Sequence, residues 1–195
     1  MGISLGNSTL CVIDFETTGV VQGYENEPWQ IGLVYIKEGL IDSNSMWEQY
    51  IHIDEDRPFN PHVPGRHSQI RDILKNSPNK HEVFNKLKNK LPKDGFVAHN
   101  CSTEKKMLKI LAPLHLFGPW IDTLKISKEA WPNLKGYSLE ELVIQLQLQN
   151  RIDHFLKHKT FHDALYDAVA TASIIEKLVA DGWGNISLSE LVLDS

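Results

Sequence analysis

The sequence predicts a mixed α/β fold, in which helices flank a sheet of five strands. Short apolar runs rich in β-branched and aromatic residues fill the first third of the chain, and such runs are typical of strands. Further along, short runs of this kind alternate with longer segments whose apolar residues recur at helical spacing. Consecutive strands followed by strands that alternate with helices indicate a sheet with both antiparallel and parallel neighbours.

The first three strands are expected in consecutive segments. Residues 9–15 form an apolar run that leads into Gly19, and residues 29–36 form a second run of the same kind. Residues 46–53 alternate loosely between apolar and polar side chains and predict the third strand. Residues 42–45, Asp-Ser-Asn-Ser, are predicted as the turn before it. An antiparallel meander is the simplest arrangement of three such strands.

The middle of the chain predicts alternating helices and strands. After a proline-rich loop, residues 67–74 predict a short helix and residues 81–91 a second helix, which the following proline ends. Residues 95–98 then predict a short strand, residues 102–111 a helix, and residues 120–124 another short strand. Each of the two later strands is thus separated from its neighbour by helical sequence.

Two capping signals mark the helices of the C-terminal third. Ser138 and Glu141 have the spacing of a capping box at the start of a helix over residues 138–148. Asp163 is placed as the N-cap of the last long helix, residues 164–180. The apolar side chains of that helix recur along one stripe, so one side of it should face the sheet.

The composition fits one globular domain over residues 1–195, with a core of about residues 9–180. The chain is 42% apolar and 23% charged, which is ordinary for a protein that buries a sizeable core. Residues 181–195 form a short tail. Its apolar side chains predict that it packs back onto the domain, and they are Ile186, Leu188, Leu191 and Val192.

Charge and apolar pattern narrow the location and the class of protein. No stretch of about 18 uncharged apolar residues is present, so we expect no membrane span, and residues 1–10 lack the pattern of a secretory signal. With only Cys11 and Cys101 as cysteines, a cytoplasmic, reducing location is the expectation. The net charge of −5 disfavours a protein that coats long duplexes, but not an enzyme that holds a few nucleotides.

Asp14 and Glu16 form the first candidate site. They lie two residues apart at the end of a predicted strand, so their side chains should point to the same face. Two acids on one face are unfavourable unless something neutralises them, and a divalent cation with oxygen ligands does so. Solvent-facing acids are the alternative, but here the strand is apolar on both sides and Thr-Thr-Gly follows at once.

His162 and Asp167 form the second candidate site. Five residues along a helix correspond to about 500°, so two helical side chains would diverge by about 140°. They converge if His162 lies in the loop before the helix, with Asp163 as N-cap, and Asp167 lies in the second turn. Alanines near the start of the helix keep it close to the sheet, so that Asp167 can approach Asp14.

These segments resemble a known family. Residues 14–19, Asp-Phe-Glu-Thr-Thr-Gly, closely resemble the first motif of the DEDD superfamily of 3′→5′ exonucleases, which includes ribonuclease T and the proofreading subunit of bacterial DNA polymerase III. Residues 162–168, His-Asp-Ala-Leu-Tyr-Asp-Ala, resemble the third motif of its histidine-containing subclass, DEDDh. The resemblance covers about residues 10–178 and implies a ribonuclease-H-like fold. It also implies that Asp167 is a metal ligand and that His162 accepts the proton of the attacking water.

The second motif of the family matches with one departure. Residues 95–100, Gly-Phe-Val-Ala-His-Asn, resemble its start, and the family then has an aspartate five residues after the histidine. That position is Glu104, which carries the same charge on a side chain one methylene longer. An acid in the first turn of a helix is also stabilised by the helix dipole without a metal, so this alternative stays open.

Asp122 is the rival ligand, but an Asp-Thr-Leu segment at this place is common in the family outside the metal site, so we interpret Asp122 as a turn or cap residue.

Together the candidate residues predict two-metal hydrolysis of a phosphodiester. Two Mg²⁺ or Mn²⁺ ions about 3.5–4 Å apart would be bridged chiefly by Asp14, and Glu16, Glu104 and Asp167 would complete the site. With His162 accepting a proton, a nucleoside 5′-monophosphate would leave from the 3′ end. The resemblance also implies three contacts to the terminal nucleotide, namely Thr17, Thr18 and Asn100.

The expected partner is the 3′ end of DNA or RNA, taken as single-stranded. Most lysine groups of the chain are interpreted as solvated helix faces, but Lys157 and Lys159 come shortly before His162 and could contact a phosphate. Homodimer formation or association with a polymerase is implied by the resemblance. The alternative is a catalytically impaired nucleic-acid-binding or polymerase-accessory module of the same fold, which the glutamate at position 104 suggests.

Overall fold

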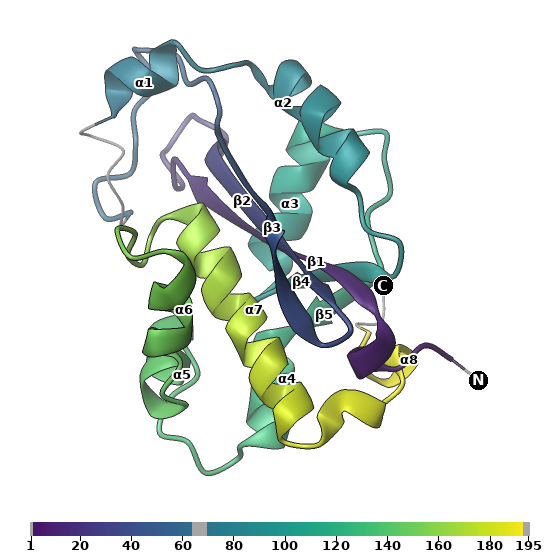
Figure 1. Ribbon diagram of the computed structural model, residues 1–195. Coiled ribbons are helices and arrows are strands. Elements are labelled where there is room, and N and C mark those ends of the chain that lie inside the picture. Colours follow the sequence, from purple (N-terminus) through teal and green to yellow (C-terminus); the bar gives the residue numbers. More distant parts are fainter. Residues whose placement is uncertain (1, 64–69, 193–195) are drawn as a thin grey trace.

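Five strands form one mixed sheet at the centre of the molecule (Figure 1). The computed structural model describes residues 2–63 and 70–192. The strands are β1 Thr9–Thr17, β2 Pro28–Lys37, β3 Leu40–Tyr50, β4 Gly95–Ala98 and β5 Trp120–Asp122. Their order is β3-β2-β1-β4-β5, with antiparallel pairs among the first three strands and parallel pairs from β1 to β4 and from β4 to β5. The predicted mixed sheet and its antiparallel meander are confirmed.

Helices lie on both faces of the sheet (Figure 1). The α-helices are α1 Arg71–Lys75, α2 Lys80–Leu87, α3 Ser102–Leu111, α4 Thr123–Ala130, α5 Leu139–Gln145, α6 Gln149–Phe155, α7 Ala164–Ala180 and α8 Leu188–Leu191. Short 3-10 turns are present at Leu5–Asn7, Lys88–Lys90 and Trp183–Asn185. Within the described residues, no helix combines the length and the apolar character needed to cross a bilayer.

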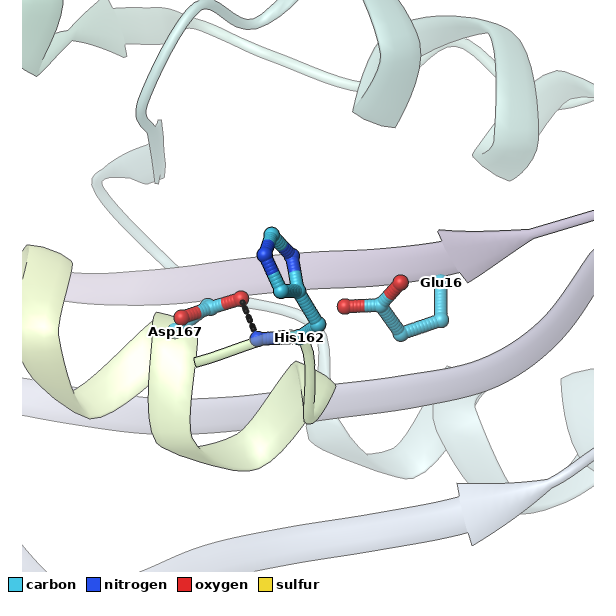
Figure 2. A group of neighbouring side chains, drawn as sticks. All are labelled: Glu16, His162 and Asp167. Atoms are coloured by element: carbon cyan, nitrogen blue, oxygen red, sulfur yellow. Dashed lines mark hydrogen bonds between the residues drawn. The ribbon is translucent and has the colours of Figure 1, made fainter. Parts of the chain in front are cut away.

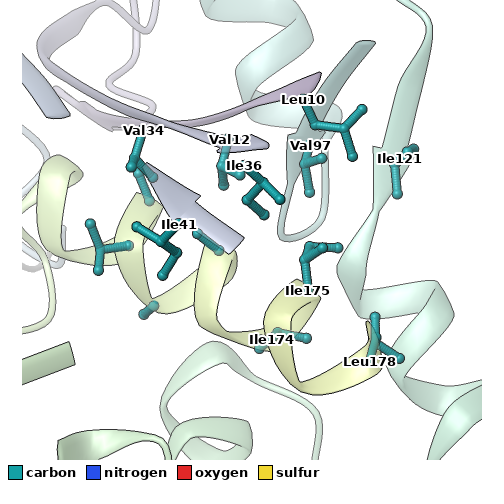
Figure 3. Packing of buried hydrophobic residues seen from close by; sticks show 14 of the residues in the cluster. Leu10, Val12, Val34, Ile36, Ile41, Val97, Ile121, Ile174, Ile175 and Leu178 are labelled. Carbon is teal, nitrogen blue, oxygen red and sulfur yellow. The ribbon is translucent and has the colours of Figure 1, made fainter. Parts of the chain in front are cut away.

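Alternation along β1 separates two apolar cores. Leu10 and Val12 point to the face that packs on α7, as Figure 3 shows. Cys11 and Ile13 point to the opposite face, where α2 and α3 pack. The side chains that follow on the first face, beyond Val12, therefore lie against the start of α7.

The turn between β2 and β3 differs from the prediction. The chain reverses at Glu38 and Gly39, whose φ angles of 51° and 75° suit a two-residue hairpin. Residues 42–45, predicted as the turn, lie inside β3 where the register with β2 shifts. The Ser45 hydroxyl accepts the backbone N–H of Tyr35 at 2.8 Å in place of a strand carbonyl. The polar segment is thus a bulge, and its composition resembles that of a turn because both interrupt the strand ladder.

Helices after β5 are more numerous than predicted. β5 has three residues, and Asp122 starts α4 directly by accepting the backbone N–H of Leu124 at 3.0 Å. The helix predicted over 138–148 ends at Gln145 as α5, and Gln147, with a φ of 57°, separates it from α6. The capping box at Ser138 is present as predicted.

Helix α1 and the C-terminal tail also correspond to predicted segments. The short helix predicted over 67–74 corresponds to α1, and residues 67–69 lie outside the described residues. The tail does pack back onto the domain, because Leu188 and Leu191 of α8 are buried against the α7 side of the sheet.

Candidate active site

The candidate residues gather at the carboxyl ends of β1 and β4, which are parallel neighbours. Asp14 and Glu16 follow Val12 on the sheet face that packs on α7. Glu104 lies in the first turn of α3, shortly after β4 ends. The topology therefore brings together acids that are up to 90 residues apart in the sequence.

Glu16, His162 and Asp167 form a close group, shown in Figure 2. One potential ligand atom of each residue lies within 4.8 Å of those of the other two. Glu16 and Asp167 are 7% and 8% exposed, whereas His162 is open to solvent. Two buried acids beside an accessible imidazole can hold a cation and exchange a proton with water.

The loop before α7 sets the position of the histidine. His162 has a φ of 65°, in the left-handed region that few residues other than glycine adopt. Its backbone N–H donates to Oδ2 of Asp167 at 3.0 Å. Asp163 caps the helix as predicted, since its Oδ1 accepts the backbone N–H groups of Leu165 and Tyr166. Asp167 lies in the first turn of α7 and not in the second, and the left-handed turn at His162 brings the two residues together.

The start of α7 approaches the sheet at a glycine that the sequence analysis did not single out. Gly32 lies opposite Asp14 on β2. A Cβ atom at Gly32 would lie 2.2 Å from the backbone nitrogen of Leu165 and 2.3 Å from the carbonyl carbon of Ala164. Only glycine therefore allows α7 to contact the sheet at this point. A glycine inside a strand pattern is a sign of close backbone approach, and this signal could have identified it.

Gln30 and Glu48 are two further supporting residues that the sequence analysis missed. The buried Gln30 side chain accepts the backbone N–H of Ala164 at 3.3 Å and donates to Glu48 at 3.3 Å. Glu48 also pairs with Lys159 at 2.6 Å, and Lys159 pairs with Asp163 at 2.8 Å. Lys159 thus braces the loop before α7, and its contact with a phosphate stays a prediction.

Burial and mutual repulsion raise the pKa values of the acids. Burial raises the pKa of Asp14 well above its ordinary range, and nearby Asp167, Glu104 and Glu16 raise it further. Burial also raises the pKa of Glu16 and of Glu104 to about 8. The pKa of Asp167 rises to about 7, again chiefly through burial. In the absence of a cation these acids therefore oppose one another's ionisation.

Two oxygens of this cluster lack a hydrogen-bond partner in the described part of the chain. They are Oε2 of Glu104 and Oδ1 of Asp167, and both are buried. Buried polar atoms are rarely left unpaired, so each such atom indicates a missing partner. Hard divalent cations such as Mg²⁺ or Mn²⁺ take oxygen ligands and favour ionised carboxylates. The residues present fit such ions, and Glu104 lies where it can take part in holding one.

Asp122 uses its carboxylate to hold backbone. Its two oxygens accept the N–H groups of Asn100 at 2.9 Å, Cys101 at 3.3 Å and Leu124 at 3.0 Å. Asp122 is therefore a turn and cap residue, as predicted. Glu104 keeps an unpaired oxygen in the cluster and is the better placed of the two acids to bind a cation.

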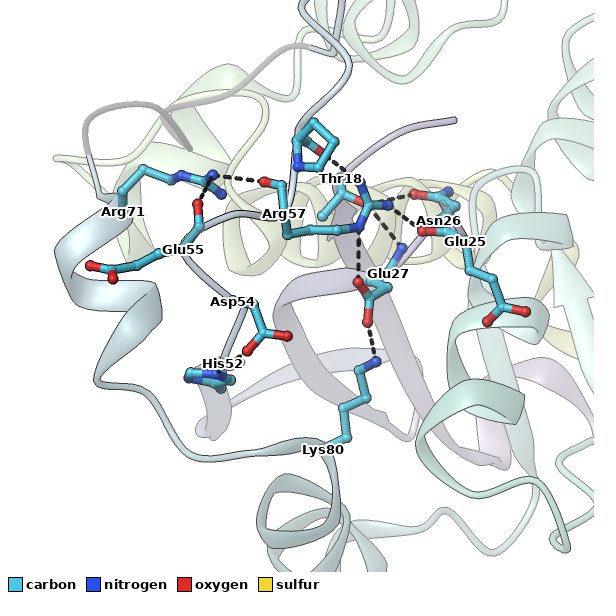
Figure 4. A network of polar contacts seen from close by, with 11 residues as sticks. Thr18, Glu25, Asn26, Glu27, His52, Asp54, Glu55, Arg57, Arg71 and Lys80 are labelled. Atoms are coloured by element: carbon cyan, nitrogen blue, oxygen red, sulfur yellow. Dashed lines mark hydrogen bonds and ion pairs between the residues drawn. The ribbon is translucent and has the colours of Figure 1, made fainter. Parts of the chain in front are cut away.

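The three predicted substrate contacts have different environments. Asn100 is exposed, with a φ of 65°, and Thr17 is half-buried at the end of β1. The Thr18 hydroxyl is buried and accepts the Arg57 guanidinium and the backbone N–H of Glu27, each at 3.0 Å (Figure 4). The Thr18 hydroxyl is therefore bonded within the protein, and the contact of Thr18 with a nucleotide stays a prediction. The contacts of Thr17 and Asn100 with the terminal nucleotide stay predictions.

Comparison with known proteins identifies the family. The profile of the RNase T family, described as Exonuclease, matches residues 11–175. The chain belongs to this exonuclease family. This family comprises 3′→5′ exonucleases of the DEDDh type, which are phosphodiester hydrolases that use divalent metal ions.

Longer bacterial proteins contain segments similar to this exonuclease. The DNA polymerase III PolC-type of Bacillus cereus is 28% identical over 188 residues, which are 91% of this chain and 12% of the polymerase. The 3′-5′ exonuclease DinG of Staphylococcus haemolyticus is 28% identical over 187 residues, which are 89% of this chain and 18% of that protein. The chain thus spans less than a fifth of the length of these curated relatives.

Solved structures share the fold of this exonuclease. Exonuclease X in complex with 5′ overhanging duplex DNA is 26% identical, with a TM-score of 0.70 over 93% of this chain and 98% of that one. The nuclease domain of 3′hExo, a DEDDh family member bound to rAMP, is 16% identical, with a TM-score of 0.74 over 97% and 98% of the two chains. The Mg²⁺- and Mn²⁺-bound form of S. pombe Pop2p is 16% identical, with a TM-score of 0.68 over 94% and 87%. The predicted ribonuclease-H-like fold is confirmed.

Proposed function

We propose that this exonuclease removes nucleoside 5′-monophosphates from single-stranded 3′ ends of DNA. The observation that carries the proposal is the group of buried acids beside the exposed His162, at the carboxyl ends of two parallel strands. DNA is favoured over RNA because the PolC-type relative is a DNA polymerase and exonuclease X, at 26% identity, was solved with DNA.

Four acids would hold two divalent cations, either Mg²⁺ or Mn²⁺. They are Asp14, Glu16, Glu104 and Asp167. The two unpaired buried oxygens and the raised pKa values of the cluster support this assignment. When bound, such cations lower the pKa of water and neutralise the charge that develops on the phosphate.

His162 accepts the proton of the attacking water in this proposal. A ring nitrogen of histidine can accept a proton from water and so act as a general base. Asp167 bonds the backbone N–H of His162 and not its ring, so the ring can take up a proton without losing that contact. Solvent exposure of the ring gives the proton a route to bulk water after each cycle.

A polymerase is the protein partner that the comparisons favour. Most of this chain matches a segment of the PolC-type polymerase, so a proofreading task beside a polymerase is consistent with the proposed chemistry. Homodimer formation stays a prediction from the family resemblance.

The deciding experiment is a digest of matched 5′-labelled DNA and RNA oligonucleotides by the purified protein. Single strands and recessed 3′ ends of duplexes are compared in Mg²⁺, Mn²⁺ and EDTA. We expect a ladder of shortened labelled products from single-stranded DNA with either metal and none in EDTA. Degradation of RNA alone, or faster degradation of the recessed end, would contradict the proposed substrate.

The role of His162 is tested by His162→Ala. We expect kcat to fall by about 10²–10⁴-fold, which is the usual contribution of a general base. His158→Ala is the matched control, because His158 is also exposed in the same loop. A kcat close to that of the unmodified enzyme at neutral pH would remove His162 from the proposed chemistry.

A further inference from the structure

We propose that the nucleic-acid strand leading to the reacting 3′ end lies in a groove between the loop after β1 and helix α3. In this groove an unpaired base stacks on Tyr24, and phosphates contact Lys106 and Lys109. The inference rests on the proposed function, because it extends the path of the same substrate away from the acids.

One wall of the groove is the loop that continues from the end of β1, the strand that carries Glu16. The groove has a volume of about 760 Å³, and its walls are the loop of residues 20–26 and the exposed side of α3. The loop wall is tied to that end of β1, because Arg57 bonds the Thr18 hydroxyl at 3.0 Å and lies against the Tyr24 ring. The other wall belongs to α3, whose first turn carries Glu104. A strand whose 3′ end lies at the acids can therefore continue along the loop wall into this groove.

The Tyr24 ring is held as a platform on one wall. The Arg57 guanidinium carbon lies 4.8 Å from the ring centroid, and Arg57 is only 6% exposed. Bonds to Thr18 and Glu27 fix that guanidinium, as Figure 4 shows. The Tyr24 backbone closes a tight turn through its N–H to the carbonyl of Val21 at 3.0 Å.

A base can use this platform because the ring remains accessible. Tyr24 is 51% exposed although Arg57 covers part of it. Stacking on an ordered aromatic ring accepts any base, but only a base that is outside a duplex can reach it. The platform therefore selects an unpaired strand without selecting its sequence.

Lys106 and Lys109 supply positive charge on the opposite wall. Both are exposed, and their spacing of three residues places them on the same side of α3. Neither forms an ion pair with any residue in the described ranges, whereas Lys80 of the same groove pairs with Glu27. A chain of net charge −5 with a cluster of acids repels a polyanion, and the unpaired lysines of this groove offset that repulsion.

The aromatic platform facing two lysines indicates nucleic acid rather than a protein segment. Single-strand binding sites combine stacking surfaces for bases with cations along the backbone, and the two walls provide one of each. Glu25 also lines the groove and is exposed, so its charge should oppose binding. Replacing Glu25 with an uncharged residue should therefore strengthen binding, whereas replacing the lysines should weaken it.

The experiment compares steady-state kinetics on a long single-stranded DNA and on a dinucleotide, which is too short to fill the groove. For Tyr24→Ala we expect KM on the long substrate to rise by about 5- to 100-fold, in line with the loss of one stacked base, with kcat unchanged. Tyr24→Phe keeps the ring and should behave like the unmodified enzyme. On the dinucleotide all three proteins should have the same KM.

The proposed phosphate contacts of the two lysines are tested by the double variant Lys106→Ala, Lys109→Ala. Its KM on the long substrate should rise, and the slope of log KM against log salt should become shallower by about 1.4, or 0.7 for each lost phosphate contact. The control is Lys125→Ala, Lys135→Ala, which removes two exposed lysines outside this groove and should leave KM unchanged. Glu25→Gln should lower KM.

The outcomes separate this inference from the proposed function. An unmodified protein that does not degrade DNA with either metal would contradict the proposed function itself. An active protein whose KM is insensitive to Tyr24→Ala and to the double lysine variant would contradict the groove alone. An equal rise in KM on the dinucleotide would also contradict it, since the affected contact would then lie at the reacting nucleotide.

Discussion

At the scale of single residues, Glu104 and Asp122 are neighbouring buried acids with opposite environments. Burial chiefly raises the pKa of Glu104 and nearby Asp122 raises it further, so the two charges act on each other. The Asp122 oxygens accept three backbone N–H groups, whereas Oε2 of Glu104 has no such partner in the described chain. A carboxylate whose oxygens are already bonded to backbone serves the fold, and one with an unpaired oxygen needs a proton or a cation.

Glu104→Gln tests this difference because it removes the charge and keeps the size. We expect a fall in kcat of at least about 100-fold, which is the upper end of the effect of outer-shell partners of a metal. Glu104→Asp keeps the charge and should retain measurable activity. Asp122→Asn should lose about 1–3 kcal/mol of stability through its backbone contacts, with Mn²⁺ binding unchanged. Calorimetric titration with Mn²⁺ and urea unfolding measure the two effects, and loss of Mn²⁺ binding only in Asp122→Asn would reverse the assignment.

At the scale of elements, the start of α7 is held by contacts from three segments. Gln30 and Gly32 of β2 contact its first residues, Glu48 belongs to β3, and Lys159 lies in the preceding loop. Because His162 and Asp167 flank this helix start, any displacement of it moves two candidate catalytic groups at once.

Gly32→Ala should displace the helix. The added Cβ would meet backbone atoms of α7, which cannot rotate away, so we expect a loss of about 1–3 kcal/mol of stability together with a lower kcat. Gly182→Ala is the matched control at the other end of α7, where a Cβ meets nothing within 4 Å but φ is 101°. That strain should reduce stability by about 1–2 kcal/mol with kcat unchanged. Urea unfolding and kcat measure both variants, and an unchanged kcat in Gly32→Ala would show that the helix start is adaptable.

Lys159→Met should loosen the loop before α7. Loss of the pairs with Glu48 and Asp163 should reduce stability by about 1 kcal/mol, since Lys159 is only 20% exposed, and should lower kcat. Lys157→Met, at an exposed neighbouring position, should change neither quantity. A raised KM with normal kcat and stability in Lys159→Met would instead support a phosphate contact.

At the scale of the whole molecule, local signals predicted the sheet and the long helices. The apolar run of β1 and the cap at Asp163 are contained within a few residues, so sequence reasoning located them. The α4 helix was missed because Asp122 ends β5 and caps α4 without any break between them. The α6 helix was missed because Ile152 is its one fully buried residue, so it has little apolar periodicity.

In the candidate site too, some features follow from a local sequence pattern and others only from the tertiary structure. The spacing of Asp14 and Glu16 on a strand is local and predicts their shared face. The Thr18 hydroxyl bonds Arg57, which is 39 residues away, and no local pattern contains that contact. Gly32 matters only because α7 packs over it, a fact that belongs to the tertiary structure.

The acid cluster links the stability of the whole molecule to pH and to cations. The folded metal-free protein has pKa values of about 8 at Glu16 and Glu104 and about 7 at Asp167, above those of the unfolded chain. The folded state therefore holds more protons than the unfolded state, between about pH 4 and these values. The contribution of these protons to stability is fully present below the pKa values that the acids have in the unfolded chain. It is lost as pH rises through the higher pKa values that they have in the folded protein.

We therefore expect the melting temperature of the metal-free protein to fall as pH rises from about 5 to about 9. The fall should be smaller in Glu104→Gln, because glutamine does not titrate. Mg²⁺ or Mn²⁺ should raise the melting temperature most at the high end of this range, since ionised acids bind cations best and binding to the folded state alone stabilises it. Scanning calorimetry in EDTA and in excess metal measures both slopes. Equal slopes with and without metal would mean that the acids titrate independently of any cation, and the proposed metal site would then be wrong.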